Sequence, residues 1–421
     1  MNRRFKARLI YLIVITIFAI LFQPYIFSTQ IIAKAQTSGC VANFQSVSVP
    51  LTDLGNQEYI RMDGSSTGFS GGLYPNGENV RPQDHENAGV VLANSIQPLN
   101  TDGNLDPENG KIVFISIGMS NTSIEFDTFM QLSKDDPDIN PQVLMINGAL
   151  SSQTSDRWVD PNAITWQNIA NLLDRYQLSP SQVQVAWIKL TQTRGGEFPA
   201  KALALESDLE KIVQNLKAAY PNVKIAFLSS RIYSYTYFRG LSPEPNAFET
   251  GYSVKWLIEK QLDGDPNMNY DPQKGAVFAP YLSWGPYLWA NGQNPRSDGL
   301  TWLQEDLEAD CTHPTASGKL KVANMLLEFF KNDSITMPWF LANPENDFPL
   351  YLPIVTQTTT PVFEPTALPT TPSPPTPTVS PSVEIAITMT PMLIPTEIPS
   401  TQSPNLFVII LDWIKKLFSR K

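Results

Sequence analysis

The sequence contains very few cysteines and histidines, and this shortage excludes several classes of protein. Only two cysteines (Cys40 and Cys311) and two histidines (His85 and His313) occur among its 421 residues. Two cysteines can build neither a disulfide-dense scaffold nor a cysteine-based zinc cluster. Any chemistry that needs an imidazole must therefore use one of the two histidines, and we expect neither a metal nor a cofactor.

Basic residues are scarce relative to acidic ones. The chain has 30 Lys and Arg against 40 Asp and Glu, which gives a formal net charge of -10. Such a chain repels phosphate backbones, so binding to nucleic acid is not expected. With 42% hydrophobic residues, the chain can form one substantial core with appendages.

The N-terminus has the pattern of an export signal. A basic stretch is followed by an apolar run over 9–22 and by Ala33-Lys34-Ala35, a small-residue cleavage pattern. We predict a signal peptide over 1–35 and a secreted or cell-surface protein. An uncleaved anchor is the alternative, although Gln23 and Pro24 interrupt the apolar stretch. In an oxidising compartment Cys40 and Cys311 can pair, and two unrelated thiols are the alternative.

Composition divides the rest of the chain. Residues 36–110 are rich in Gly, Asn, Pro and Asp, which predicts an irregular lead-in packed on the core. Residues 353–404 are dominated by Pro, Thr and Ser and are typical of an extended stalk. The apolar and basic tail over 405–421 is too short to span a bilayer and suits contact with a membrane surface. Docking of this tail on the protein or on a partner is the alternative.

Between the lead-in and the stalk, residues 111–352 alternate between two hydrophobic patterns. Short β-branched runs predict strands at 111–119, 142–149, 182–190 and 223–229, while 276–282 is a fifth strand or part of a loop. Longer segments predict helices at 123–134, 163–176, 201–220, 248–262 and 315–331. This alternation predicts a three-layer α/β/α sandwich around a mostly parallel sheet of about five strands. Ligands of such folds bind at the carboxyl ends of the strands.

Two motifs lie where this fold places its chemistry. The segment GMSNT at 118–122 follows the first strand, so Ser120 is at the carboxyl edge of the sheet. The segment DCTHP at 310–314 precedes the last helix. A serine becomes a nucleophile when a base takes its proton, and an Asp three residues before a His can orient that base. Each motif alone also fits residues that only cap a helix.

Together the motifs resemble the SGNH (GDSL-like) hydrolase superfamily. GMSNT resembles its first block, G-D-S-x-T, with Met119 in place of the Asp, and DCTHP resembles its last block, D-x-x-H-P. The resemblance covers 111–331. It implies a flavodoxin-like fold, with Ser120 as the nucleophile, His313 as the base and Asp310 as the residue that orients it.

The middle blocks depart from the family. The second block, N-x-x-x-x-G-x-T, corresponds to NGALSSQT at 147–154, with Ser152 where Gly is usual. The third block, G-x-N-D, has no matching Asn. The resemblance therefore implies an oxyanion hole built from the N–H groups of Ser120 and Ser152, with Gly148 as a nearby donor. Lys189, as a cation, or Gln192, as an amide, could replace the missing Asn.

Five residues near these motifs are candidate substrate contacts: Asn121, Gly148, Gln192, Arg231 and Trp284. Arg231 could bind a carboxylate or phosphate, or pair with a structural acid such as Glu244 or Glu249. Trp284 belongs to an aromatic loop that could face sugar rings or acyl groups, or fill the core. His85 lies in a polar stretch and is predicted to be a solvated loop residue that could line the cleft.

These observations predict an exported serine esterase that hydrolyses carboxylic esters through an acyl-enzyme on Ser120, with extracellular acetylated glycans as a candidate substrate. A disulfide between Cys40 and Cys311 would hold the mature N-terminus beside the loop of Asp310 and His313. The alternative is a non-catalytic carbohydrate-binding or adhesive surface protein on the same fold, which the altered third block and the stalk favour.

Overall fold

The computed structural model describes residues 40, 46–194, 196–238 and 240–344. The predicted signal peptide (1–35), stalk (353–404) and tail (405–421) lie outside these residues. Within the described ranges, no helix is both long and apolar enough to cross a membrane.

The centre of the fold is a five-stranded parallel sheet. Its strands are β3 (Ile112–Gly118), β4 (Val143–Asn147), β5 (Val183–Lys189), β6 (Ile225–Leu228) and β7 (Tyr281–Trp284). They are ordered β4-β3-β5-β6-β7, which is the flavodoxin-like order. All residues of the central strands β3 and β5 are buried, as expected for a parallel sheet covered on both faces. The predicted fold class is confirmed, and the uncertain fifth strand exists but begins at Tyr281.

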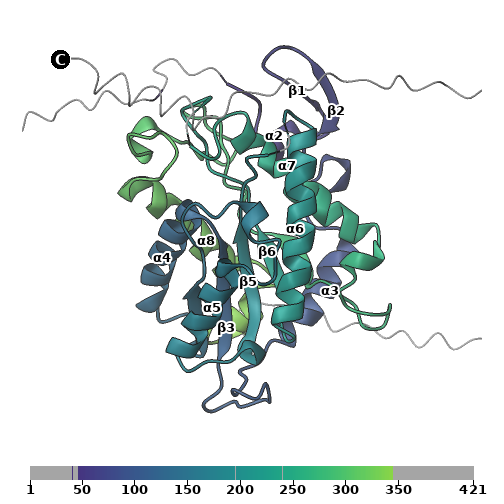
Figure 1. Cartoon of the computed structure of the whole chain (residues 1–421), viewed down its shortest axis with the longest axis vertical. Helices are drawn as coiled ribbons and strands as arrows, with labels where there is room; N and C mark the ends of the chain where they lie inside the picture. The colour runs from purple at the N-terminus through teal and green to yellow at the C-terminus, as the bar shows by residue number, and fades with distance from the viewer. Residues whose placement is uncertain (1–39, 41–45, 195, 239, 345–421) are drawn as a thin grey trace, which may run out of the picture. The chain divides into compact units, whose positions relative to one another are not determined.

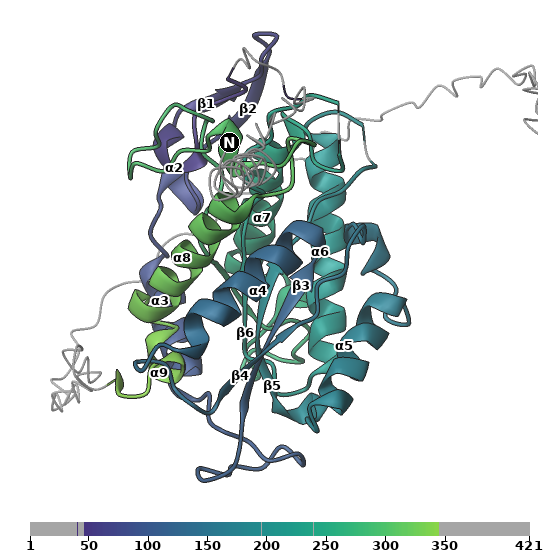
Figure 2. The ribbon, with the colours of Figure 1, turned by 90° about the vertical axis from the view of Figure 1, so that its left-hand side faces the viewer.

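Five long helices cover the sheet. They are α4 (Ser120–Lys134), α5 (Ile164–Arg175), α6 (Ala200–Ala219), α7 (Asn246–Leu262) and α8 (Ala316–Asn332). Helices α4 and α8 pack together on one face, and α6 and α7 pack together on the other (Figures 1 and 2). Aromatic side chains join the first pair to the sheet: Phe126 stacks on Trp187, and Phe227 packs edge-on against Phe329 and Phe330.

The lead-in has more regular structure than its composition predicts. It contains α2 (Leu51–Leu54), the antiparallel pair β1 (Glu58–Ile60) and β2 (Ser66–Ser70), and the 12-residue helix α3 (Gln83–Asn94). After the sheet, the short helix α9 (Met337–Phe340) follows α8. Single 3-10 turns occur at Pro75–Gly77, Ser155–Arg157, Pro180–Gln182, Pro266–Met268 and Gln304–Asp306. The prediction of an irregular lead-in is therefore wrong for α3.

Helix α3 protects the edge strand β7 through His85. The His85 ring stacks on Tyr281, and its Nε2 donates to the carbonyl oxygen of Leu282 at 2.8 Å. The N–H of Leu282 donates to Gln261 Oε1, so both polar backbone groups of this edge residue are satisfied by side chains. Burial lowers the pKa of His85 to about 4. His85 is therefore a buried neutral histidine, and its prediction as a solvated loop residue is wrong.

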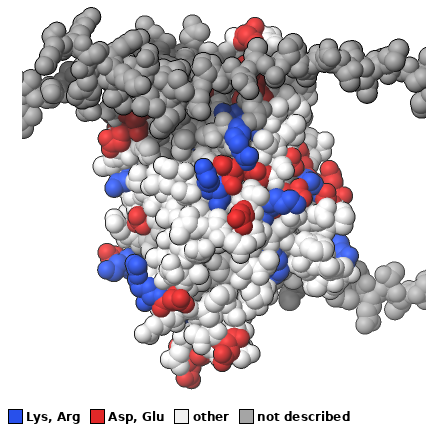
Figure 3. Space-filling model, in the orientation of Figure 1, with Lys and Arg blue, Asp and Glu red and all other residues white. Residues whose placement is uncertain are grey.

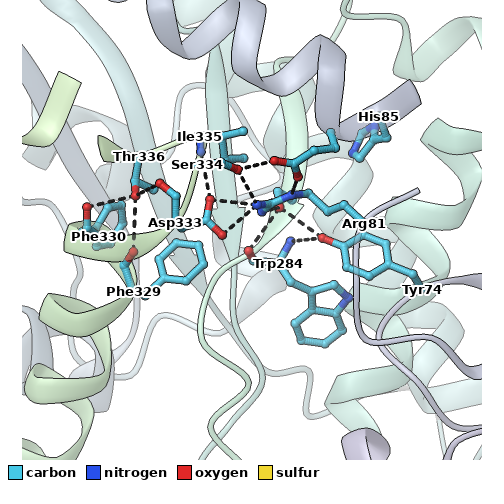
Figure 4. A network of polar contacts seen from close by, with 12 residues as sticks. Tyr74, Arg81, His85, Trp284, Phe329, Phe330, Asp333, Ser334, Ile335 and Thr336 are labelled. Atoms are coloured by element: carbon cyan, nitrogen blue, oxygen red, sulfur yellow. Dashed lines mark hydrogen bonds and ion pairs between the residues drawn. The ribbon is translucent and has the colours of Figure 1, made fainter. Parts of the chain in front are cut away.

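A partly buried ion-pair network joins the lead-in to the region after α8. Figure 4 shows the Arg81 guanidinium pointing at Asp333, with the two oxygens of Asp333 at 2.8 and 2.7 Å from Arg81 Nη2. Arg81 also donates to Ser283 of β7 at 3.1 Å and pairs with Glu86 of α3. One side chain thus connects α3, β7 and the end of α8.

Replacing Arg81 with Met should lower the free energy of unfolding by about 2 kcal/mol, because the Asp333 carboxylate, whose side chain is 16% exposed, would lose its cation. The matched control is Arg157→Met, whose side chain is 67% exposed and lies 3.6 Å from Asp156. That change should cost less than about 0.5 kcal/mol. Urea unfolding of the full chain measures both values, and equal losses in the two variants would contradict the prediction.

Candidate active site

Ser120 is the first residue of α4 and follows β3 after a single residue, Met119. The turn is held by Thr122, whose hydroxyl donates to the carbonyl oxygen of Lys189 at 2.8 Å and accepts from the N–H of Met119. A Cβ on Gly118 would lie 2.2 Å from Thr122 Oγ1 and 2.6 Å from the Lys189 carbonyl oxygen, so only glycine fits. The helix begins three residues before the predicted start at 123, and this places Ser120 at its N-terminus.

His313 lies between Ser120 and Asp310. Its Nε2 is 2.7 Å from Ser120 Oγ, and its Nδ1 contacts Asp310 Oδ2. Because the carboxylate can only accept, we assign the ring proton to Nδ1, which leaves Nε2 as the acceptor for the serine hydroxyl. The structure thus brings together the three residues that the sequence predicts as a group.

Backbone hydrogen bonds keep Asp310 ionised. Burial would raise the pKa of Asp310, but hydrogen bonds from the N–H groups of His313 and Thr312, at 2.9 and 3.0 Å, and from the His313 ring lower it. The carboxylate can therefore orient the ring and compensate a positive charge on it.

The loop that carries His313 is held from three sides. Asn121 Nδ2 donates to the carbonyl oxygen of Thr312 at 2.8 Å. The carbonyl oxygen of Cys311 accepts from the N–H of Tyr235 at 3.1 Å and from Ser234 Oγ at 3.2 Å. A disulfide joins Cys311 to Cys40, so the predicted pairing is confirmed. Asn121 is only 1% exposed and supports this loop, so its prediction as a substrate contact is wrong.

The site is open to solvent. The side chains of His313 and Asp310 are 38% and 46% exposed. Two hollows among the described residues lie elsewhere: one of about 580 Å³ beside Trp256 and Asp263, and one of about 280 Å³ beside Leu92 and Tyr270. Neither is lined by Ser120, His313 or Asp310.

The structural neighbours of the chain include SGNH hydrolases and carbohydrate esterases, together with two acyltransferases. A protein of Slackia heliotrinireducens described as an SGNH hydrolase is 14% identical, with a TM-score of 0.29 over 52% of this chain and 99% of its own. A carbohydrate esterase family 3 protein of Talaromyces cellulolyticus is 13% identical, with a TM-score of 0.30 over 51% and 94%. A Bacteroides fragilis protein described as an acylhydrolase is 11% identical, with a TM-score of 0.32 over 61% and 100%.

No family model and no curated protein matches the sequence. At these identities and TM-scores the structural likeness assigns no activity. The function proposed below therefore depends on the fold and on the geometry of the site.

Ser152, which stands at the glycine of the second SGNH block, adopts the backbone conformation that favours glycine. Its φ is 63°, in the left-handed region, and the residue is exposed. A serine in this region stores strain of about 1 kcal/mol or more. The substitution therefore keeps the turn of the block, and with it a backbone N–H at this position.

Replacing Ser152 with Gly should raise the free energy of unfolding by up to about 1 kcal/mol, because the left-handed strain is relieved. The same change at Ser151, which does not have a positive φ, should lower it by about 0.4–1 kcal/mol, because glycine increases the entropy of the unfolded chain. Thermal unfolding of the two variants measures the difference. A loss of stability in Ser152→Gly as large as in Ser151→Gly would contradict the prediction.

The two side chains predicted to replace the third-block Asn are directed elsewhere. Lys189 is fully buried, and its Nζ pairs with Glu125 of α4. Gln192 is 1% exposed; its amide donates to Asp208 of α6, and its Oε1 accepts from the N–H of Arg194. Both predictions are wrong for the same reason: a nearby carboxylate engages the group that would have reached an oxyanion.

Three further predicted substrate contacts are buried. Trp284 is 2% exposed and donates from its indole to the carbonyl oxygen of Leu73, so it fills the core. A Cβ on Gly148 would lie 2.6 Å from Ile169 and 2.7 Å from the Ser116 carbonyl oxygen, so this glycine permits close packing of α5. Arg231 is 4% exposed and pairs with neither Glu244 nor Glu249 among the ion pairs of the described residues.

An aromatic segment beside the site was not predicted from the sequence. Phe238 is 70% exposed and lies two residues before Gly240, whose added Cβ would be 3.0 Å from the side chain of Thr312. Thr312 precedes His313, so this segment borders the loop of the base. The signal was present as four aromatic residues, Tyr233, Tyr235, Tyr237 and Phe238, directly after the fourth strand.

Proposed function

We propose that the chain is an SGNH-type serine esterase that hydrolyses carboxylic esters through an acyl-enzyme on Ser120. The observation that carries this proposal is the 2.7 Å contact between Ser120 Oγ and His313 Nε2, with Asp310 on the other ring nitrogen. Such a chain of nucleophile, base and orienting acid is the arrangement that activates a serine hydroxyl. A protein that only binds a ligand has no need for it.

The proposed reaction has two stages. As Ser120 Oγ bonds to the ester carbonyl carbon, its proton passes to His313 Nε2 and the carbonyl oxygen becomes an oxyanion. His313 then protonates the departing alcohol oxygen as the ester C–O bond breaks, which leaves the acyl group on Ser120. Water, deprotonated by His313, repeats the sequence at the acyl carbon and releases the acid.

The oxyanion would be held by backbone donors. The first N–H groups of a helix have no partner within the helix, and Ser120 is the first residue of α4. The N–H of Ser152 is the second candidate donor. The third-block position offers no side-chain amide, because Gln192 is bound to Asp208. An oxyanion hole with only these two backbone donors should give a lower kcat than one with three donors, unless a nearby positive charge compensates for the missing donor.

We propose an ester of a large molecule as the substrate, with acetylated extracellular glycans as the first candidate. The exposed His313 and Asp310 favour this choice, because a site that is open to solvent can receive an ester group that projects from a polymer. Phe238, exposed beside the same loop, offers an aromatic face to a sugar ring or an acyl chain. Export to the cell exterior is part of the proposal and depends on the N-terminal pattern and on the disulfide.

Nucleic acid is not among the proposed partners. The net charge is -10, and on the described part of the face in Figure 3 the lysines and arginines are interspersed with acidic residues. Contact of the tail with a membrane surface remains a proposal.

The test is a reaction of the full exported chain with a fluorophosphonate, followed by peptide mass spectrometry, beside acetate release from acetylated xylan. We expect a single phosphonylated residue, Ser120, and loss of labelling in Ser120→Ala. Labelling without acetate release would retain the esterase and reject the glycan. Absence of both labelling and ester hydrolysis would favour the second candidate, a carbohydrate-binding surface protein, which the lost third-block amide supports.

A further inference from the structure

Three charged side chains form a buried cluster next to the strand end that precedes Ser120. They are Glu125 of α4, Lys189 at the end of β5 and Arg231 after β6, with exposures of 0%, 0% and 4%. Lys189 Nζ pairs with Glu125 Oε2, and the charge of Glu125 also acts on Arg231. Two cations thus share one carboxylate in the interior.

The hydrogen bonds of this cluster are incomplete. Arg231 Nε and Nη1 have no acceptor, and Glu125 Oε1 has no donor, within the described part of the chain. Burial lowers the pKa of Arg231, and it lowers that of Lys189 to about 8, with the positive charge of Arg231 adding to the effect on Lys189. A buried, uncompensated cation is costly, so a fold that retains one without any use for it would be unusual.

Each member of the cluster is linked to one part of the candidate active site. Glu125 lies four residues after Asn121, on the same face of α4, and Asn121 holds the loop of His313. Lys189 pairs in register with Gly118, and its carbonyl oxygen accepts from Thr122 in the turn of Ser120. Arg231 begins the segment whose Ser234 and Tyr235 hold Cys311. The excess positive charge therefore lies within the framework that positions the nucleophile and the base.

We propose that Arg231 is an electrostatic positioning residue whose uncompensated positive charge stabilises the oxyanion formed at Ser120, in place of the side-chain amide that Gln192 does not supply. This inference rests on the proposed function. Arg231 need not touch the substrate, because a fixed charge in a water-excluded interior acts over a longer range than the same charge in solvent. Glu125 compensates the charge of Lys189 and leaves that of Arg231 in excess.

The test compares variants of the full chain that differ in net buried charge. Arg231→Met and Arg231→Gln remove the excess charge. The double variant Glu125→Gln/Lys189→Met removes one charge of each sign and so keeps the excess unchanged. Arg296→Met is the packing control, because Arg296 is also buried (7% exposed) but pairs with Asp298 and belongs to neither the cluster nor the site.

We expect kcat for p-nitrophenyl acetate to fall about tenfold or more in Arg231→Met and Arg231→Gln, with KM changed by less than about twofold, because the charge acts on the transition state. The rate of phosphonylation of Ser120 should fall in parallel. Glu125→Gln/Lys189→Met alters the same framework without changing the excess charge, so it should lower kcat clearly less than Arg231→Met does. Arg296→Met should lower the melting temperature without changing kcat.

Two results would overturn the inference. One is an unchanged kcat in folded Arg231→Gln or Arg231→Met. The other is an equal loss of kcat in Glu125→Gln/Lys189→Met, which would show that packing rather than net charge is responsible. If the parent chain is neither phosphonylated nor hydrolytic, the proposed function itself fails and this inference fails with it. A reactive parent with equally reactive Arg231 variants would overturn this inference alone.

Discussion

Replacing Ser120 with Ala should lower kcat/KM for p-nitrophenyl acetate by about four to six orders of magnitude, which is the largest effect expected from any single change in this chain. The hydroxyl that would attack the ester is lost, while the N–H of residue 120 at the start of α4 remains. His313→Ala should cost a similar factor, because Ser120 would lose the acceptor that lies 2.7 Å from its Oγ. The losses should not add in the double variant, since the two residues act as a unit.

Asp310→Asn tests the role of the carboxylate separately. An amide can present its N–H to His313 Nδ1, which would put the ring proton on Nε2 and block acceptance from Ser120. A loss of about four orders of magnitude with unchanged melting temperature is the expected result. The control is Ser123→Ala, one turn along α4, whose Oγ contacts Asn147 at 3.2 Å.

A variant lacking Ser120 but keeping more than a tenth of the activity would reject the acyl-enzyme.

Reduction of the Cys40–Cys311 disulfide should lower both the stability and the activity of the protein. Cys311 stands between Asp310 and His313, and its backbone is in the left-handed region with a φ of 68°. The bond joins residues 271 positions apart, so its loss should cost about 2–5 kcal/mol of unfolding free energy through the greater freedom of the unfolded chain. Because Cys311 lies inside the loop of the base, we also expect kcat to fall at least about tenfold at temperatures where the protein stays folded.

The effect of a dithiol reductant can be assigned to a single bond, because the chain has only two cysteines and they form this disulfide. Activity should fall as two thiols appear per chain, and reoxidation should restore it. Cys40→Ser/Cys311→Ser should match the reduced protein, while reductant should leave the activity of this double variant unchanged. Full activity in a reduced, folded chain would show that the hydrogen bonds to the Cys311 carbonyl hold the loop without the disulfide.

Local patterns predicted most of the fold because each sheet strand and its following helix carry their own signal. The buried runs of β3 and β5 and the long helix α6 were placed to within one or two residues. Helix α3 was missed because its sequence, QDHENAGVVLAN, begins with polar residues and has a glycine in the middle. Its stability comes from contacts with β7, such as the stacking of His85 on Tyr281, and these are absent from the local sequence.

The candidate site was also predicted only in part from local sequence patterns. The positions of Ser120 just after the first strand of the sheet and of Asp310 three residues before His313 could be predicted from the sequence, because both features depend only on short stretches of chain. The resemblance of the two motifs to the SGNH superfamily also predicted the type of chemistry that is proposed above. The disulfide could be proposed because only one pairing of two cysteines exists.

The roles of the neighbouring polar side chains became clear only from their packing in the fold. Asn121, Lys189, Gln192 and Arg231 all lie near the carboxyl edge of the sheet, and all point into the protein rather than toward a ligand. Their partners are far away in sequence: Lys189 meets Glu125 across 64 positions, and Asn121 meets Thr312 across 191. A side chain at a strand end can turn inward or outward, and the difference depends on which charge a distant helix brings beside it.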